Sequence, residues 1–101
     1  MAQWTKVAET ADVPPGRGRV VGVGGRDVAL FNVDGTFFAI DNTCVHRGGP
    51  LGEGNLSGPV VACPWHGWQY DVRTGENALD DRFRVVCYPV RVDGASVLVE
   101  L

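Results

Sequence analysis

The sequence lacks any long hydrophobic run. No stretch approaches the roughly 18 consecutive apolar residues that a membrane-spanning helix needs. The first ten residues, MAQWTKVAET, also lack the charged and then apolar order of a signal peptide. A chain of 101 residues has room for one domain, spanning 1–101, but not for a second. We therefore expect a soluble, cytoplasmic single-domain protein without a membrane partner.

A basic face is lacking as well. Lysine and arginine number 9 against 12 aspartates and glutamates, which gives a net charge of −3. The densest basic spots are pairs, Arg17 with Arg19 and Arg82 with Arg84, and pairs of this kind are typical of a solvated surface. Because a phosphate backbone requires a basic surface, we expect no nucleic-acid partner.

Cysteine and histidine are scarce and unevenly placed. The three cysteines are an odd number, which argues against a disulfide framework in a cytosolic chain. Cys87 lies in the apolar stretch RVVCYPV, so we expect it to pack as a small buried hydrophobic residue. The two histidines each lie within three residues of one of the other cysteines, and this double pairing is unlikely to arise by chance.

Helical periodicity is missing from the chain. No window sustains a 3.6-residue apolar period over three turns, so a substantial helix is not expected beyond a single turn around Thr10–Asp12. Instead, Gly24-Gly25, Asp34-Gly35 and Asp93-Gly94 each separate two apolar runs, which is the signature of tight β-hairpins. We predict an all-β fold of small antiparallel sheets, with strands at Trp4–Val7, Arg19–Val23, Val28–Val33, Thr36–Ile40, Val60–Ala62, Trp68–Val72, Val85–Val92 and Ser96–Leu101.

Residues 41–58 have no strand pattern. They read DNTCVHRGGPLGEGNLSG and contain few apolar side chains that could order them. Irregular segments of this length are uncommon in compact domains and are usually functional. We expect something other than a hydrophobic core to order this segment.

Two short motifs suggest a metal site that would do so. They are Cys44-x-His46 and, after sixteen residues, Cys63-x-x-His66. Zinc accepts two cysteines and two histidines, although its sites usually group like ligands together. A c-type haem would need C-x-x-C-H, which is absent. A [2Fe–2S] cluster with two cysteines on one iron and two histidines on the other suits mixed pairs on both arms.

The stretch FAIDNTCVHRGGPLGEG…VVACPWHGWQYDVRTGE resembles the Rieske [2Fe–2S] family, and the resemblance extends from about Trp4 to the end of the chain. It implies an antiparallel β-sandwich base with a cluster-binding subdomain on two loops, at about 41–58 and 63–68. It implies one cluster per chain, with Cys44 and Cys63 on one iron and His46 and His66 on the other. Glycines in these loops would let backbone N–H groups approach the sulfurs.

The resemblance also indicates which kind of Rieske protein this is. Members in cytochrome bc complexes carry two bridging cysteines and a serine near a sulfide, where this chain has Gly49, Trp65 and Trp68. Tyr70 matches a tyrosine that can bond a cysteine sulfur. Because fewer hydrogen bonds to sulfur stabilise the added electron less, we predict a potential nearer about −150 mV than +300 mV.

The scarcity of histidine excludes a catalytic role. An oxygenase catalytic subunit needs two further histidines for a mononuclear iron, and both histidines here are committed to the cluster. We therefore predict a one-electron carrier, not an enzyme, with no small-molecule substrate. It would pass electrons from a flavin-dependent reductase to a terminal ring-hydroxylating oxygenase. Two alternatives remain: a small subunit of a larger redox enzyme such as assimilatory nitrite reductase, and a structural zinc module.

The resemblance places the histidine end of the cluster near the surface, where electrons would enter and leave. The docking patch predicted around it consists of Arg47, Pro50, Leu51 and Trp65, with Trp68 as a further candidate. For both tryptophans the alternative role is to shield the cluster from water, and this alternative is the stronger one for Trp68.

Overall fold

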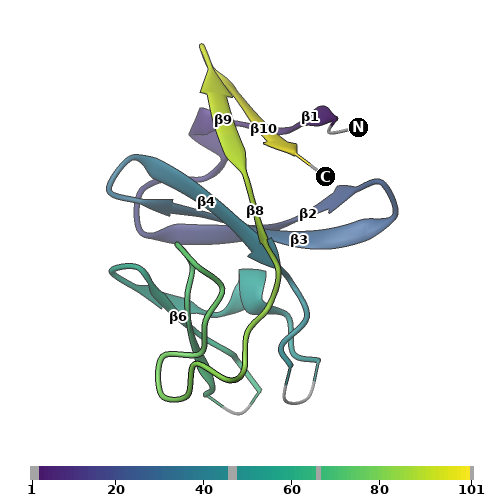
Figure 1. Cartoon of the computed structure of the whole chain (residues 1–101). Coiled ribbons are helices and arrows are strands. Elements are labelled where there is room, and N and C mark those ends of the chain that lie inside the picture. The colour runs from purple at the N-terminus through teal and green to yellow at the C-terminus, as the bar shows by residue number, and fades with distance from the viewer. Residues whose placement is uncertain (1–2, 46–47, 66, 101) are drawn as a thin grey trace.

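The computed structural model describes residues 3–45, 48–65 and 67–100, and this part of the chain is almost entirely β (Figure 1). Its strands form three antiparallel sheets. The first sheet holds β1 (Trp4–Glu9), β10 (Ser96–Glu100) and β9 (Val90–Asp93), in that order. The second holds β2 (Arg17–Val23), β3 (Arg26–Val33), β4 (Thr36–Asp41) and β8 (Cys87–Tyr88). The third holds β5 (Asn55–Ser57), β6 (Val60–Ala62) and β7 (Gln69–Asp71).

Among the described residues, the helices are two single 3₁₀ turns, η1 (Thr10–Asp12) and η2 (Leu51–Glu53). The first was expected from the sequence and lies where it was predicted. Within the described ranges, no helix is long and apolar enough to cross a membrane.

Tight turns join the strands of the second sheet, as predicted. Gly24 and Gly25 both have positive φ (57° and 81°), as a type I′ hairpin turn requires. At the next turn Asp34 (φ 51°) precedes Gly35 (φ 93°), and the Asn32 Oδ1 accepts a hydrogen bond from the Gly35 N–H at 2.7 Å. These turns fix the register of β3 against both of its neighbours.

The second sheet is the middle layer of the molecule because both of its faces are covered. Side chains alternate across β3, so that Val28 and Leu30 enter one hydrophobic core while Ala29 and Phe31 enter another. The first core also contains Val97 and Val99 of β10, so it lies between the first and second sheets. A strand buried on both faces needs a continuous apolar run, and Val28–Phe31 provides one.

The second core joins the middle sheet to the layer that contains the third sheet. We call this layer the loop layer; it comprises η2, β5, β6, β7 and the loops around them, at the bottom of Figure 1. Leu51, Val61, Tyr70 and Val72 are fully buried residues that this layer contributes to the core. The first two sheets thus form a β-sandwich base, and the loop layer with the third sheet lies beneath it, which confirms the predicted fold class.

The structure corrects the prediction for residues 41–58, because this segment contains η2 and β5. The strand is only three residues long and pairs with β6 through Asn55↔Ala62 and Ser57↔Val60. A strand this short presents too few residues for an alternating pattern to show in the sequence. Leu51 is completely buried, so the hydrophobic core contributes to ordering this segment.

The predicted strand at Val85–Val92 is also wrong in detail. It is two strands, because β8 pairs with β4 in the middle sheet and β9 pairs with β10 in the first sheet. Pro89 lies between them; it has no N–H for a ladder, and its carbonyl accepts a hydrogen bond from the Glu100 N–H at 3.0 Å. The chain therefore changes sheets at the proline.

Cys87 is exposed, contrary to the expectation that it would be buried. Tyr88 enters the first core. Because adjacent side chains in a strand point to opposite faces, Cys87 points away from that core. β8 is also the edge strand of the second sheet. The Cys87 Sγ lies 3.5 Å from the Arg73 carbonyl oxygen. Apolar neighbours in the sequence did not reveal which face the thiol occupies.

Candidate metal centre

Two loops of the same local structure carry Cys44 and Cys63. In the first loop the Gly48 N–H donates to the Cys44 carbonyl at 2.8 Å, and the Cys44 N–H donates to the Gly49 carbonyl at 3.0 Å. In the second loop the Gly67 N–H donates to the Cys63 carbonyl at 2.9 Å, and the Cys63 N–H donates to the Trp68 carbonyl at 2.7 Å. Both cysteines therefore begin equivalent turns.

A glycine closes each turn, with φ of 73° at Gly48 and 75° at Gly67. This left-handed conformation is costly for residues with a Cβ, which explains a glycine four residues after each cysteine. Both glycine N–H groups bond to cysteine carbonyl oxygens, so these two N–H groups hold the turns closed. The expectation that glycines let backbone N–H groups approach the sulfurs stays a prediction.

Gly49 brings the two loops into contact. A Cβ on this residue would lie 2.5 Å from the Cys63 Sγ and 3.1 Å from the Trp65 Cγ. The thiol of the second loop is thus pressed against the backbone of the first, immediately beyond the turn that Cys44 begins. Any side chain at position 49 would force the loops apart.

The two thiols are buried and are not joined to each other. Cys44 is 2% exposed and Cys63 is 3% exposed, both lie in the second hydrophobic core, and neither forms a disulfide. A structural cysteine can be buried for packing alone. Two of them, in equivalent turns that touch, are better explained as a pair of ligands. Their predicted histidine partners, His46 and His66, lie outside the described residues, as does Arg47.

Tyr70 at the centre of β7 lies beside the first thiol. Its Oη is 3.3 Å from the Cys44 Sγ, and both side chains are buried. Burial and then the neighbouring Cys44 raise the pKa of Tyr70 well above its usual range, while hydrogen bonds from the Val45 N–H and the Asn77 side chain act in the opposite direction. The phenol keeps its proton at neutral pH and can donate it to the sulfur. The sequence indicated this contact correctly.

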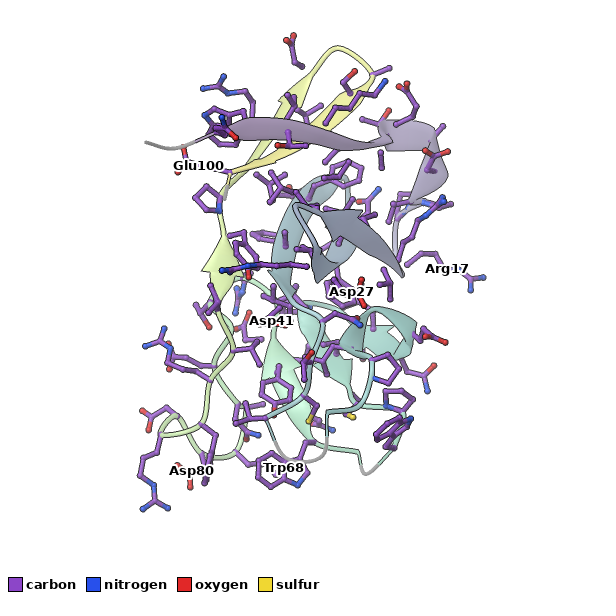
Figure 2. The ribbon with its side chains drawn as sticks, turned by 90° about the vertical axis from the view of Figure 1, so that its right-hand side faces the viewer. Arg17, Asp27, Asp41, Trp68, Asp80 and Glu100 are labelled. Atoms are coloured by element: carbon purple, nitrogen blue, oxygen red, sulfur yellow. The ribbon has the colours of Figure 1, made fainter. Side chains whose placement is uncertain are left out.

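The tryptophans differ in exposure. Trp65 is 59% exposed, whereas Trp68 is half-buried and meets the Phe83 ring edge-on, with centroids 5.4 Å apart. Figure 2 shows Trp68 at the lower end of the molecule, on the loop layer. Trp68, Leu79 and Phe83 line a surface cavity of about 400 Å³ that also reaches Gly67. Trp68 is thus positioned to cover the second loop, and Trp65 to face outwards.

Leu51 cannot belong to a docking patch, which corrects the sequence prediction. Its side chain is fully buried in the second core, together with Cys44 and Cys63. The motif places Leu51 close to the ligands in sequence, but the direction of its side chain is set by η2. Pro50, which precedes it, is partly exposed.

Sequence reasoning missed Asn77 and the exposed apolar side chains of the loop that follows it. Asn77 is buried beside Tyr70, with which it forms an isolated β-bridge. Leu79 is 89% exposed. The segment NALDD carries a turn signature that could have suggested a cap, but its place beside Tyr70 follows only from the fold.

The Rieske [2Fe-2S] domain model matches residues 3–89 of this chain. The chain belongs to the Rieske [2Fe–2S] family. Two buried cysteines that form no disulfide and lie on touching loops fit the cysteine half of a Rieske centre, so the donor chemistry and the family agree. The cofactor is a [2Fe–2S] cluster, and the zinc alternative is not supported.

The proteins similar to this chain include two groups that bear on its function, dioxygenase ferredoxins and a nitrite reductase small subunit. The biphenyl dioxygenase ferredoxin subunit of Pseudomonas sp. (strain KKS102) is 39% identical over 99 residues, covering 96% of this chain and 91% of that protein. A chain in the complex of reduced oxygenase and oxidised ferredoxin in carbazole 1,9a-dioxygenase has a TM-score of 0.86 and 36% identity, covering 95% of this chain and 91% of its own.

The second group is represented by the putative NADH-dependent nitrite reductase small subunit from Mycobacterium tuberculosis. That structure has a TM-score of 0.91 and 28% identity, and covers 100% of this chain and 96% of its own. The ferredoxin relatives confirm the prediction of an electron-transfer component that is not itself catalytic. The individual ligand assignments remain predictions.

Proposed function

We propose that this Rieske protein is the ferredoxin of a ring-hydroxylating oxygenase system. It takes one electron at a time from a flavin-dependent reductase and delivers it to the terminal oxygenase, in the cytoplasm. The observation that carries this proposal is the pair of buried cysteines in equivalent, touching turns. The ferredoxin subunits of dioxygenases among its relatives support it.

The ligands we propose are Cys44 and Cys63 for one iron and His46 and His66 for the other. When bound, the cluster supplies a centre that takes up and releases a single electron. The chain itself buries both thiols in an apolar core, which excludes water from them. The turns closed by Gly48 and Gly67 fix where each cysteine lies relative to the other loop.

We propose a reduction potential at the low end of the Rieske range, about −150 mV. No disulfide can join the loops at Gly49 and Trp65, although the structure brings these two residues into contact. Trp68 provides an indole where high-potential relatives have a hydroxyl. Of the hydroxyl donors typical of those relatives, Tyr70 is present, at 3.3 Å from the Cys44 Sγ.

The docking surface we propose surrounds the two turns. We call its described apolar part the apolar rim: Val45, Trp65, Leu79 and Phe83, which are 49%, 59%, 89% and 40% exposed. Val45 and Trp65 belong to the cluster-binding loops, and Leu79 and Phe83 line a cavity with Gly67 and Trp68 of the second loop. Large exposed apolar side chains gathered in this way are typical of interaction sites. Arg47 and Pro50, predicted from the sequence, extend the patch.

The test is a redox titration of anaerobically purified protein, followed by electron paramagnetic resonance. We expect a rhombic signal with a low average g value that appears only at low potential, and its loss when either His46 or His66 is replaced by alanine. A colourless protein without this signal would contradict the assignment. A midpoint above +100 mV would contradict the proposed potential but not the ligands.

A second candidate function is the small subunit of a nitrite reductase, favoured by the structural similarity to the mycobacterial protein. The two functions differ in assembly. A ferredoxin should elute from a sizing column at its own mass of 10.8 kDa, whereas a subunit should co-purify with a large partner from its native host.

A further inference from the structure

Asn77 is a buried polar residue that makes contacts in two directions. It is 8% exposed, and its Oδ1 accepts hydrogen bonds from the Leu79 N–H at 2.9 Å and the Asp80 N–H at 3.1 Å. Its own N–H donates to the Phe83 carbonyl at 2.8 Å. Because two backbone donors hold the oxygen of the side-chain amide, the NH₂ group is left to point the other way. Tyr70 is paired with Asn77 across an antiparallel bridge, and the Asn77 side chain is a hydrogen-bond partner of its hydroxyl.

The hydroxyl of Tyr70 has three neighbours and one proton. The Cys44 Sγ lies 3.3 Å from its oxygen, and the Val45 N–H and the Asn77 side chain are its other hydrogen-bond partners. A hydroxyl has one hydrogen to donate and two lone pairs that accept. A backbone N–H and an amide NH₂ can only donate, so they occupy the lone pairs. The proton is then directed at the sulfur.

We propose that Asn77 is a positioning residue that turns the Tyr70 hydroxyl proton towards the Cys44 Sγ and thereby raises the reduction potential of the cluster. The inference rests on the proposed function in one respect, namely that Cys44 is a cluster ligand. A hydrogen bond to a ligand sulfur stabilises the reduced state, which carries the extra negative charge. Asn77 acts through Tyr70, whose Oη lies 3.3 Å from the Cys44 Sγ.

Asn77→Asp is the decisive substitution. An aspartate can still accept the Leu79 and Asp80 N–H bonds, so the loop keeps its cap, but its second oxygen can no longer donate to Tyr70. The phenolic proton should then turn from the sulfur to the new carboxylate. We expect the equilibrium constant for reduction to fall by about tenfold, which is 59 mV for a one-electron couple.

A double-mutant cycle separates this effect from the added charge. The midpoint potentials of wild type, Asn77→Asp, Tyr70→Phe and the double variant are measured on cluster-loaded protein. We expect Asn77→Asp to lower the potential much less when residue 70 is phenylalanine, because no hydroxyl is left to turn. An equal shift in both backgrounds, or no shift with Tyr70 present, would overturn the proposal.

Two further measurements keep the test decisive. Asn32→Asp is the matched control, since Asn32 is also a buried asparagine whose side chain holds a turn. Its Nδ2 donates to the Val13 carbonyl at 2.8 Å, and its Oδ1 accepts from the Gly35 N–H at 2.7 Å. It lies near the start of β4, whereas Cys44 follows the end of that strand. This substitution should leave the potential unchanged, and a shift equal to that of Asn77→Asp would count against Asn77. If Asn77→Asp does not load a cluster, Asn77→Ala takes its place in the same cycle, with the same expected loss of coupling. A wild-type protein without a Rieske signal would instead overturn the proposed function.

Discussion

At the scale of single residues, the contact between Gly49 and Cys63 is the tightest feature of the centre. The space beside Gly49 is filled by the Cys63 sulfur and the Trp65 ring, so glycine is required there for steric reasons. Its neighbour Gly48 is required for a different reason, because its φ of 73° closes the turn. Two adjacent glycines thus have separate roles that their sequence does not distinguish.

We predict that Gly49→Ala impairs cluster loading. The new methyl group would meet the Cys63 Sγ at 2.5 Å and the Trp65 ring at 3.1 Å, so the second loop has to move. Iron content and the visible absorbance of the purified protein measure the effect, which we expect to be a loss of most of the bound cluster. Gly22→Ala is the control, because its Cβ would meet nothing within 4 Å and the residue lies in β2. Equal loading of the two variants would contradict this account.

The residues of the site could be predicted from the sequence only where chemistry is local. The spacing of Cys44 and Cys63 predicted two ligand loops, and the structure brings these loops into contact, although the ligand roles stay predictions. The family resemblance predicted Tyr70 as a neighbour of a cysteine sulfur, and the structure shows it beside Cys44. Leu51 was assigned to the surface because η2 was not foreseen, and its burial follows from that turn. Asn77 was missed because its role depends on a residue seven positions away that β7 and its bridge bring alongside.

At the scale of elements, η2 anchors the loop layer to the middle sheet. A Cβ on Gly52 would lie 2.7 Å from the Val20 Cγ2 and 3.0 Å from the Val20 backbone nitrogen in β2. The Gly52 N–H also donates to the Asn42 Oδ1 at 2.8 Å, two residues before Cys44. The first cluster loop is therefore held against the middle sheet by a close contact between Gly52 and the Val20 backbone. Strand patterns predicted the hairpins correctly, but a three-residue turn has no periodicity from which it could be read.

We expect Gly52→Ala to destabilise the protein by about 1–3 kcal/mol, the usual cost of forcing extra atoms into a packed site. Part of the obstruction is backbone, which cannot move aside as a side-chain end can. Urea denaturation of the loaded protein gives the free energy of unfolding, with Gly22→Ala again as the matched control. A change below 0.5 kcal/mol, the ordinary range for surface substitutions, would show that η2 does not pack as tightly as described.

At the scale of the whole molecule, the middle sheet separates the first sheet from the layer that carries the cysteines. The first sheet and its core lie on one side of the middle sheet, and both cysteines lie on the other, in the second core. The apolar rim belongs to the loop layer alone: Val45 and Trp65 follow the cysteines, and Leu79 and Phe83 lie on the loop capped by Asn77. A partner that docks on the rim therefore meets the end of the molecule that holds the cluster.

This separation predicts that the rim controls the rate of electron transfer independently of the potential. Trp65→Ala and Leu79→Ser each remove an exposed apolar anchor, and losing such an anchor typically costs more than about 1 kcal/mol of binding, roughly fivefold in affinity. Stopped-flow reduction by the partner reductase should slow by about that factor, while the midpoint potential stays at the wild-type value. Val92→Ser is the control, since Val92 is 47% exposed but lies on β9 in the first sheet. If Val92→Ser slowed transfer as much as the rim variants, or if the rim variants transferred at the wild-type rate, the docking surface would have to lie elsewhere on the molecule.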